Sequence, residues 1–226
     1  MIWVEFGIAF VKIALVFFVV LTLVAYLSLA ERRVSAFIQD RFGPNRVGPF
    51  GFLQPLADGV KFIFKEDIIP SHADKLFYII APAFALITAI IALAVVPIGK
   101  GFSTDLFGLL PEQIFISFQI ADLNVGVLYI LAISSLSVYG VVLGGWASNS
   151  KYSFLGGLRA AAQMISYELA MGVSILGVIA WTGSLRLDEI IEAQASCWFA
   201  IPQILGCIVF VTAAFAETNR LPFDMP

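Results

Sequence analysis

The apolar run IALVFFVVLTLVAYLSLA, residues 13–30, decides the fold of this chain. It holds no charged side chain, and its length approaches the roughly 20 residues that an α-helix needs to cross a bilayer core. Glu5 precedes Lys12, so no basic segment leads into the run, and no small-residue cleavage site follows it. The run therefore predicts a retained transmembrane helix and not a signal peptide.

The composition of the whole chain agrees with that prediction. The 226 residues are 60% hydrophobic and only 13% charged, whereas roughly 25% of residues are charged in soluble domains. The mean hydropathy is +0.96. Lipid must therefore be the solvent for most of the chain. A net charge of -3 argues against nucleic acid as a partner.

We expect an all-α, polytopic transmembrane helix bundle that forms a single domain over residues 1–226. Backbone polar groups in lipid must be paired within the segment, which favours helices. Basic residues gather in the connection 31–75, so this loop is expected to be cytoplasmic and the N-terminus outside. The expected spans cover residues 8–30, 76–98, 125–147, 158–182 and 198–216.

Two further patterns concern packing and a connection. Gly140 and Gly144 form a small-residue pair at helical spacing, and a ridge of small residues runs from Ala162 through Ser166 to Ser174. Such faces let helices approach closely. Residues 99–122 connect the second and third runs, and apolar residues alternate there from Ile114 onward. This alternation favours a short strand, with an interfacial coil as a nearly equal alternative.

Residues that commonly hold redox centres are scarce. The chain has a single histidine, His72, and two cysteines, Cys197 and Cys207, without a CxxC motif. It also lacks a glycine-rich nucleotide-binding motif. The sequence therefore predicts no metal site and no cofactor bound by this chain. Any electron carrier is expected on a partner.

Acidic residues in or beside the apolar runs are the strongest candidates for chemistry. Glu168, in MISYELAMG, lies near the middle of the fourth run, where a charged acid costs about 2.5–3.5 kcal/mol on insertion scales. It is either a proton-relay carboxylate or a structural acid bonded to a neighbouring helix. Glu217, Arg220 and Asp224 follow the fifth run, where an ordinary solvated helix end is an equal alternative.

The connection RFGPNRVGPFGFLQPLADGVKFIFKE, residues 41–66, combines turns with an amphipathic pattern. Glycine–proline pairs break regular structure at short intervals. Apolar residues then recur at helical spacing from Phe52 to Phe64, with Asp58 on the other face. With the nearby arginines, this segment could shape a mouth for an amphiphile with a polar head and an isoprenoid tail. A surface loop that binds phospholipid is an equal alternative.

Long motifs resemble one family from the first run to the last residue. They are RFGPNRVGPFG, GFLQPLADGVK, GGWASNSKYSFLGGLRAAAQMISYE and AETNRLPFD. They resemble the membrane subunit called H, or 1, of NADH:quinone oxidoreductase, respiratory complex I. The resemblance implies a non-redox subunit of this translocase, inactive alone, in a bacterial inner membrane or a mitochondrial inner membrane. It implies partners among the membrane and peripheral-arm subunits, which carry flavin and iron–sulfur clusters, together with membrane lipids and quinone as substrate.

The resemblance also assigns roles to residues. Glu31, Arg32, Arg41 and Asp58 match family positions at a quinone-access chamber. Glu168, Glu217 and Asp224, with Arg220 beside them, match positions on a carboxylate path that couples quinone reduction to proton translocation. Family members have eight spans, so the chain resembles one truncated after the fifth. A stand-alone ion or solute transporter, the homologous subunit of a membrane-bound hydrogenase, and a structural anchor are the alternative interpretations.

Overall fold

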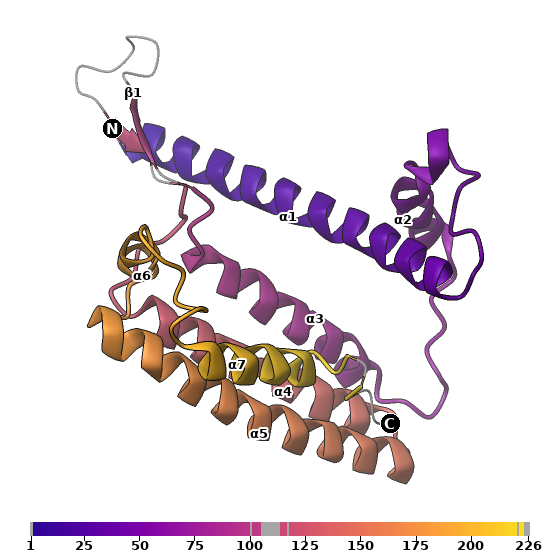
Figure 1. The fold of residues 1–226 in the computed structure, drawn as a ribbon. Coiled ribbons are helices and arrows are strands. Elements are labelled where there is room, and N and C mark those ends of the chain that lie inside the picture. Colours follow the sequence, from indigo (N-terminus) through magenta and orange to yellow (C-terminus); the bar gives the residue numbers. More distant parts are fainter. Residues whose placement is uncertain (1, 100, 105–113, 117, 221, 224–226) are drawn as a thin grey trace. The chain divides into compact units, whose positions relative to one another are not determined.

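The computed structural model describes residues 2–99, 101–104, 114–116, 118–220 and 222–223. The chain divides into two compact units, Met1–Ile68 and Ile69–Pro226. The first unit contains helices α1 (Ile2–Ile38) and α2 (Gln54–Phe64) and the 3-10 turn η1 (Pro49–Gly51) (Figure 1). The second contains α3 (Lys75–Ala92), η2 (Leu93–Val95), β1 (Phe102–Thr104), β2 (Ile114–Ile116), α4 (Gly126–Ala147), α5 (Lys151–Thr182), α6 (Leu187–Ala193) and α7 (Ile204–Glu217).

The expected all-α membrane bundle is confirmed. Within the described residues, α1, α3 with η2, α4 and α5 are long and apolar enough to cross a membrane. Helix α7 is apolar but has only 14 residues, which corresponds to about 21 Å of helix. The protein is therefore a multi-pass membrane protein whose last described helix is shorter than a bilayer core of about 30 Å.

Several helix boundaries differ from the runs read in the sequence; α5, for example, begins at Lys151 and not at residue 158. Helix α1 continues past Ala30 to Ile38, so Glu31 and Arg32 are helical. It ends where Asp40 takes a left-handed conformation, with φ 55°, and the Arg41 N–H bonds the Ala36 carbonyl at 2.9 Å.

Helix α7 begins only at Ile204, well inside the run 198–216. Pro202 accounts for the late start, because a proline disfavours the helical conformation of the residue before it. Two backbone hydrogen bonds hold the segment before α7 in turns: the Ile201 N–H donates to the Trp198 carbonyl, and the Gln203 N–H donates to the Phe199 carbonyl. The Cys207 N–H then donates to the Gln203 carbonyl as the first bond of α7.

The second unit is a series of antiparallel helix pairs, α3 with α4, α4 with α5, and α5 with α7 (Figure 1). Close approach depends on glycine. A Cβ at Gly140 would lie 2.9 Å from the Ala81 carbonyl oxygen of α3, and one at Gly145 would lie 2.9 Å from the Ser153 carbonyl oxygen of α5. The predicted packing role of Gly140 is confirmed. Ala162 and Ser166 of the predicted small ridge are instead exposed.

A short hairpin lies in the connection after η2. Strand β2 (Ile114–Ile116) confirms the alternation that favoured a strand, and it pairs antiparallel with β1, with Phe102 opposite Ile116. Residues 105–113 and 117 lie outside the described part of the chain. The all-α bundle thus carries one two-stranded element among the described residues.

Candidate functional site

In the first unit, an ion pair joins the two helices. Arg32 near the end of α1 donates from Nη1 to Oδ2 of Asp58 in α2, at 2.7 Å. Gln54, one turn earlier in α2, donates from Nε2 to Oδ1 of the same carboxylate at 3.1 Å. Both oxygens of Asp58 therefore accept hydrogen bonds. The Gln54 bond and the Arg32 guanidinium hold the pKa of Asp58 below its ordinary value near 3.8.

The turn between α1 and α2 is held by the next arginine. Arg33 donates from Nη2 to the Phe50 carbonyl, and its guanidinium lies 5.1 Å from the centre of the Phe52 ring. Gly51 has φ +76°, and a Cβ there would overlap the Pro44 carbonyl. A cation over an aromatic face and a glycine-only conformation thus fix the turn that leads into α2.

Helix α2 presents a large apolar face that the described residues leave uncovered. Leu56, Val60, Ile63 and Phe64 are 65%, 55%, 80% and 85% exposed. Asp58, by contrast, is half-buried against α1. The unit therefore combines a charged hydrogen-bonding cluster with an apolar surface, which is the chemistry that an amphiphile requires.

The other two predicted chamber residues lie near this cluster in sequence. Glu31 is an exposed residue of α1, directly before Arg32. Arg41 follows the end of α1 and donates from Nε to Oε1 of Gln39 at 2.6 Å. The structure therefore brings Arg32 and Asp58 together, whereas the side-chain bond of Arg41 is local.

In the second unit, α5 and α7 bring two predicted acids together. Glu168 of α5 and Glu217 at the end of α7 are both half-buried, and their charges are close enough to interact. They come from residues 49 positions apart in the chain, so the antiparallel packing of α5 and α7 creates the pair.

A single amide holds the end of α7 against α5. Nε2 of Gln163 lies 3.0 Å from the Phe223 carbonyl oxygen, 3.3 Å from that of Ala216 and 3.4 Å from Oδ1 of Asn219. One turn further along α5, the Tyr167 ring packs edge-on against Phe223 with centroids 5.3 Å apart. The segment after α7 is therefore fastened beside the two acids.

The two remaining predicted residues, Arg220 and Asp224, follow the end of α7 in the sequence. Arg220 is exposed, and its backbone N–H bonds the Phe215 carbonyl at 3.2 Å. Asp224 lies outside the described residues. The expected role of this pair stays a prediction.

Sequence reasoning missed Gln54 and Gln163, and it included Arg33 only as one of the arginines near the amphipathic segment. The spacing of Gln54 and Asp58, four residues apart on a predicted helix, is a readable signal because amide–carboxylate pairs at that spacing meet. An amide in an apolar span, as at Gln163, is a signal for contact between helices. The contact of Arg33 depends on the fold of the turn. Among the described side chains, no three histidine, cysteine or acidic residues are grouped as a metal site requires.

Comparison with known proteins places the chain in a family. Residues 11–226 match the family described as NADH dehydrogenase. The chain is 54% identical over 222 residues to the NADH-quinone oxidoreductase H subunit, form 1, of Geobacter metallireducens, a match that covers 98% of this chain and 65% of that protein. It is 53% identical over 218 residues to the NADH-quinone oxidoreductase H subunit of Leptospira biflexa, covering 95% of this chain and 61% of that protein.

A third relative is the NADH-quinone oxidoreductase H subunit of Rickettsia rickettsii, 54% identical over 205 residues, or 90% of this chain and 56% of that protein. The chain thus spans between 56% and 65% of the length of these relatives. The match covers both units and every candidate residue named above. This multi-pass membrane chain belongs to the NADH dehydrogenase family.

Proposed function

We propose that the chain is a membrane subunit of a proton-pumping NADH:quinone oxidoreductase. In this proposal it forms part of a quinone-access chamber and part of the carboxylate path that couples quinone reduction to proton translocation. The observation that carries the proposal is the pair of half-buried acids, Glu168 and Glu217, which α5 and α7 bring together in a chain of this family.

The first unit supplies the chamber wall. A quinone has a polar head and an isoprenoid tail. The exposed apolar face of α2 suits the tail, and the donors of Arg32 and Gln54 around Asp58 make a polar edge on the same helix pair. Glu31 and Arg41 border that edge in the sequence. The unit therefore guides an amphiphile along α2 and does not itself exchange electrons with it.

The second unit supplies proton-carrying groups. Placing an acidic side chain inside a membrane bundle costs free energy, and such acids mark proton relays in many transport proteins. In this proposal Glu168 and Glu217 serve as successive proton-carrying groups on one path, because α5 and α7 bring the two side chains together. Arg220 and Asp224 continue the path on the residues that follow.

The electron carriers belong to partner subunits in this proposal. Flavin and iron–sulfur clusters bind on the peripheral arm, and the other membrane subunits carry the translocated protons onward. The chain alone has no activity. Its native site is a bacterial inner membrane, with the mitochondrial inner membrane as the alternative.

Purification tests the assignment to an assembly. A tagged chain extracted in mild detergent should migrate with partners that carry flavin and iron–sulfur absorption. Migration as a lone protein would contradict the proposal and favour a stand-alone transporter.

Labelling tests the chamber. A photoreactive quinone analogue applied to the assembly should label peptides between Arg32 and Lys65, and excess natural quinone should suppress the label. Labelling confined to other subunits would limit this chain to a structural anchor.

A further inference from the structure

A second site lies in the second unit, away from the acid pair. Helices α4, α5, α6 and α7 enclose a partly open cavity of about 380 Å³. On α5 its wall runs from Met171 to Val178, further along the helix than Glu168. Most of the lining side chains are aliphatic, aromatic or sulfur-containing, among them Leu131, Met171, Ile175, Ile190, Phe199 and Phe210.

The polar side chains in this wall are already occupied. Ser174 donates to the Met171 carbonyl at 2.6 Å, and Gln203 donates from Nε2 to the Gly177 carbonyl at 2.8 Å. Gln194 donates to the Ile190 carbonyl at 3.2 Å, and its Oε1 accepts the Phe199 N–H at 3.3 Å. The wall therefore offers mainly hydrocarbon. An apolar cavity of about 150 Å³ already stays dry and takes hydrocarbon ligands, so this larger one suits a hydrocarbon occupant.

The surroundings of the cavity identify a source of hydrocarbon. Val173 and Leu176 of α5 and Leu205 and Ile208 of α7 are between 57% and 75% exposed beside it. Helix α5 is long and apolar enough to span the bilayer, and lipid acyl chains are the hydrocarbon that a bilayer offers to exposed side chains on such a helix. An acyl chain can enter the cavity from this surface without leaving an apolar environment.

Helix α6 gives the rim of the cavity a charge. Leu187, Ile190 and Gln194 line the cavity on one face of α6, and the other face carries acidic side chains, which are Asp188, Glu189 and Glu192.

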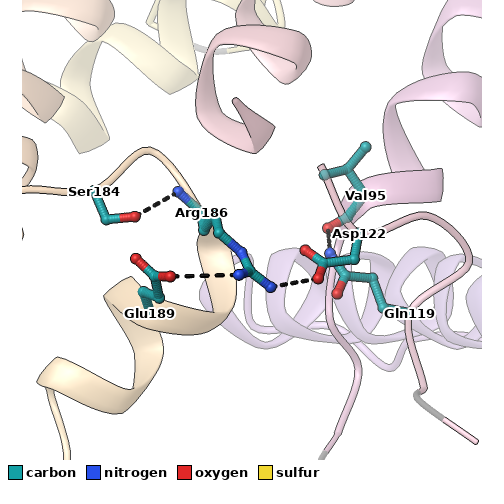
Figure 2. A network of polar contacts seen from close by, with 6 residues as sticks. All are labelled: Val95, Gln119, Asp122, Ser184, Arg186 and Glu189. Atoms are coloured by element: carbon teal, nitrogen blue, oxygen red, sulfur yellow. Dashed lines mark hydrogen bonds and ion pairs between the residues drawn. The ribbon is translucent and has the colours of Figure 1, made fainter. Parts of the chain in front are cut away.

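Arg186 anchors the start of α6 (Figure 2). It bonds Asp122 through Nη2 and Glu189 through Nη1, the latter at 3.4 Å, and its N–H donates to Ser184 Oγ at 3.1 Å. The rim thus holds four carboxylates against one guanidinium. That charge attracts an ammonium group and repels an anionic one.

We propose that this cavity binds one acyl chain of a zwitterionic phospholipid, whose ammonium head group lies against the acidic rim formed by α6. The site needs α4 to α7 to lie in a bilayer, and it needs neither quinone nor proton transfer. A failure of the lipid site would therefore leave the proposed function untouched, and a failure of the proposed function would leave the lipid site untouched.

Photo-crosslinking in the assembly that the chain forms in its native membrane tests the proposal. The probe is phosphatidylethanolamine with a diazirine in one acyl chain, added before extraction. Detergent washing then removes loosely bound lipid, and the sample is irradiated only after washing. We expect crosslinks on peptides that contain Met171, Ile175 or Cys207. Lipid on the exposed face of α1 should be washed away before irradiation, so no crosslink is expected there. A phosphatidylglycerol probe of the same chain should label the cavity at least threefold less.

A matched pair of variants locates the site. Ala200 lines the cavity, so Ala200→Phe should fill it and reduce the retained crosslink at least fivefold. Ala195 is exposed and does not line the cavity, so Ala195→Phe should leave the crosslink unchanged. Co-purification with the same partners shows that each variant assembles. Equal labelling by both head groups overturns the head-group assignment. No retained crosslink in the wild-type chain, as when another protein segment fills the cavity, overturns the site.

Discussion

Nη1 of Arg32 lies 2.7 Å from Oδ2 of Asp58, and this contact joins α1 to α2. The other carboxylate oxygen accepts from Gln54, so one acid connects a membrane-spanning helix, the start of the amphipathic helix and the apolar face beside it. The placement of that face therefore depends on the charge of Asp58.

Replacing Asp58 with Asn should loosen α2 from α1. The amide keeps the size of the carboxylate but loses the charge that Arg32 pairs with. We expect faster hydrogen exchange over Gln54–Phe64 and, in the assembled enzyme, a KM for a long-chain quinone raised about threefold or more with kcat little changed. Glu66→Gln removes a charge from the exposed end of the same segment and serves as the control. Identical exchange and KM in both variants would contradict a role for the bridge.

The same contact predicts a pH dependence. The folded pKa of Asp58 is lowered by the Gln54 hydrogen bond and by Arg32, below its ordinary value near 3.8. A lowered pKa means that the contact stabilises the unit at pH above the ordinary value and is lost as pH falls through the lowered one. Protection of α2 from hydrogen exchange, corrected for intrinsic rates, should be constant from neutral pH to about 4 and fall below that. Asp58→Asn should lack the fall; a fall of the same size in the variant would assign it to another group.

Two glycines of the same unit should respond in opposite ways to alanine. Gly51→Ala places a Cβ against the Pro44 carbonyl in a conformation with φ +76°, and such strain costs on the order of 1–3 kcal/mol. Gly59 lies inside α2 with open space around it, so Gly59→Ala should stabilise the helix by about 1 kcal/mol. Trypsin cleavage after Arg46 should accelerate in the first variant and not in the second. Slow cleavage in both would show that the turn is not under the constraint described.

Gln163→Leu should release the segment after α7. The substitution removes an amide whose donors reach three acceptors at and after the end of α7, of which two can be used at once. Hydrogen bonds between membrane helices average about 0.6 kcal/mol, so the loss is about 1 kcal/mol, or roughly fivefold in local opening. Trypsin cleavage after Arg220 measures it. Ser166→Ala is the control, since Ser166 bonds only its own helix, to Ala162 at 2.9 Å; equal cleavage in the two variants would rule out the fastening role.

Hydropathy predicts the helices of this chain because a segment that crosses a bilayer must be apolar and must pair its own backbone polar groups. Hydropathy does not predict where these helices end. The continuation of α1 to Ile38 carries Glu31 and Arg32 beyond the apolar run. Helical hydrogen bonding does not require apolar side chains, so a charged segment can extend a span into the aqueous phase. The late start of α7 follows from Pro202, a local rule that a window of average hydropathy cannot register.

In the candidate site, too, the sequence predicts some features and not others. Glu168 and Glu217 stand out in the sequence because charge is rare in and beside the apolar runs. Arg32 and Asp58 lie in a connection with many charges, and only the family resemblance singles them out. The pairing of these residues is not predicted, since Arg32 meets Asp58 and Glu168 approaches Glu217 only through contacts between helices. Gln54 illustrates the reverse case, in which a four-residue spacing in the sequence predicts the contact with Asp58.

Proton pumping by the assembled enzyme tests the central claim most directly. Glu168→Gln, Glu217→Gln and the double variant would be compared, with Glu192→Gln on the acidic face of α6 as the matched control. Quinone reduction and acidification of vesicles are measured together, with NADH oxidation by a water-soluble acceptor as the check on assembly. We predict that each single variant loses coupled turnover about tenfold or more, that the double variant is no worse than the singles because both acids serve one path, and that the control keeps full activity. Normal pumping in both Glu168→Gln and Glu217→Gln would contradict the account.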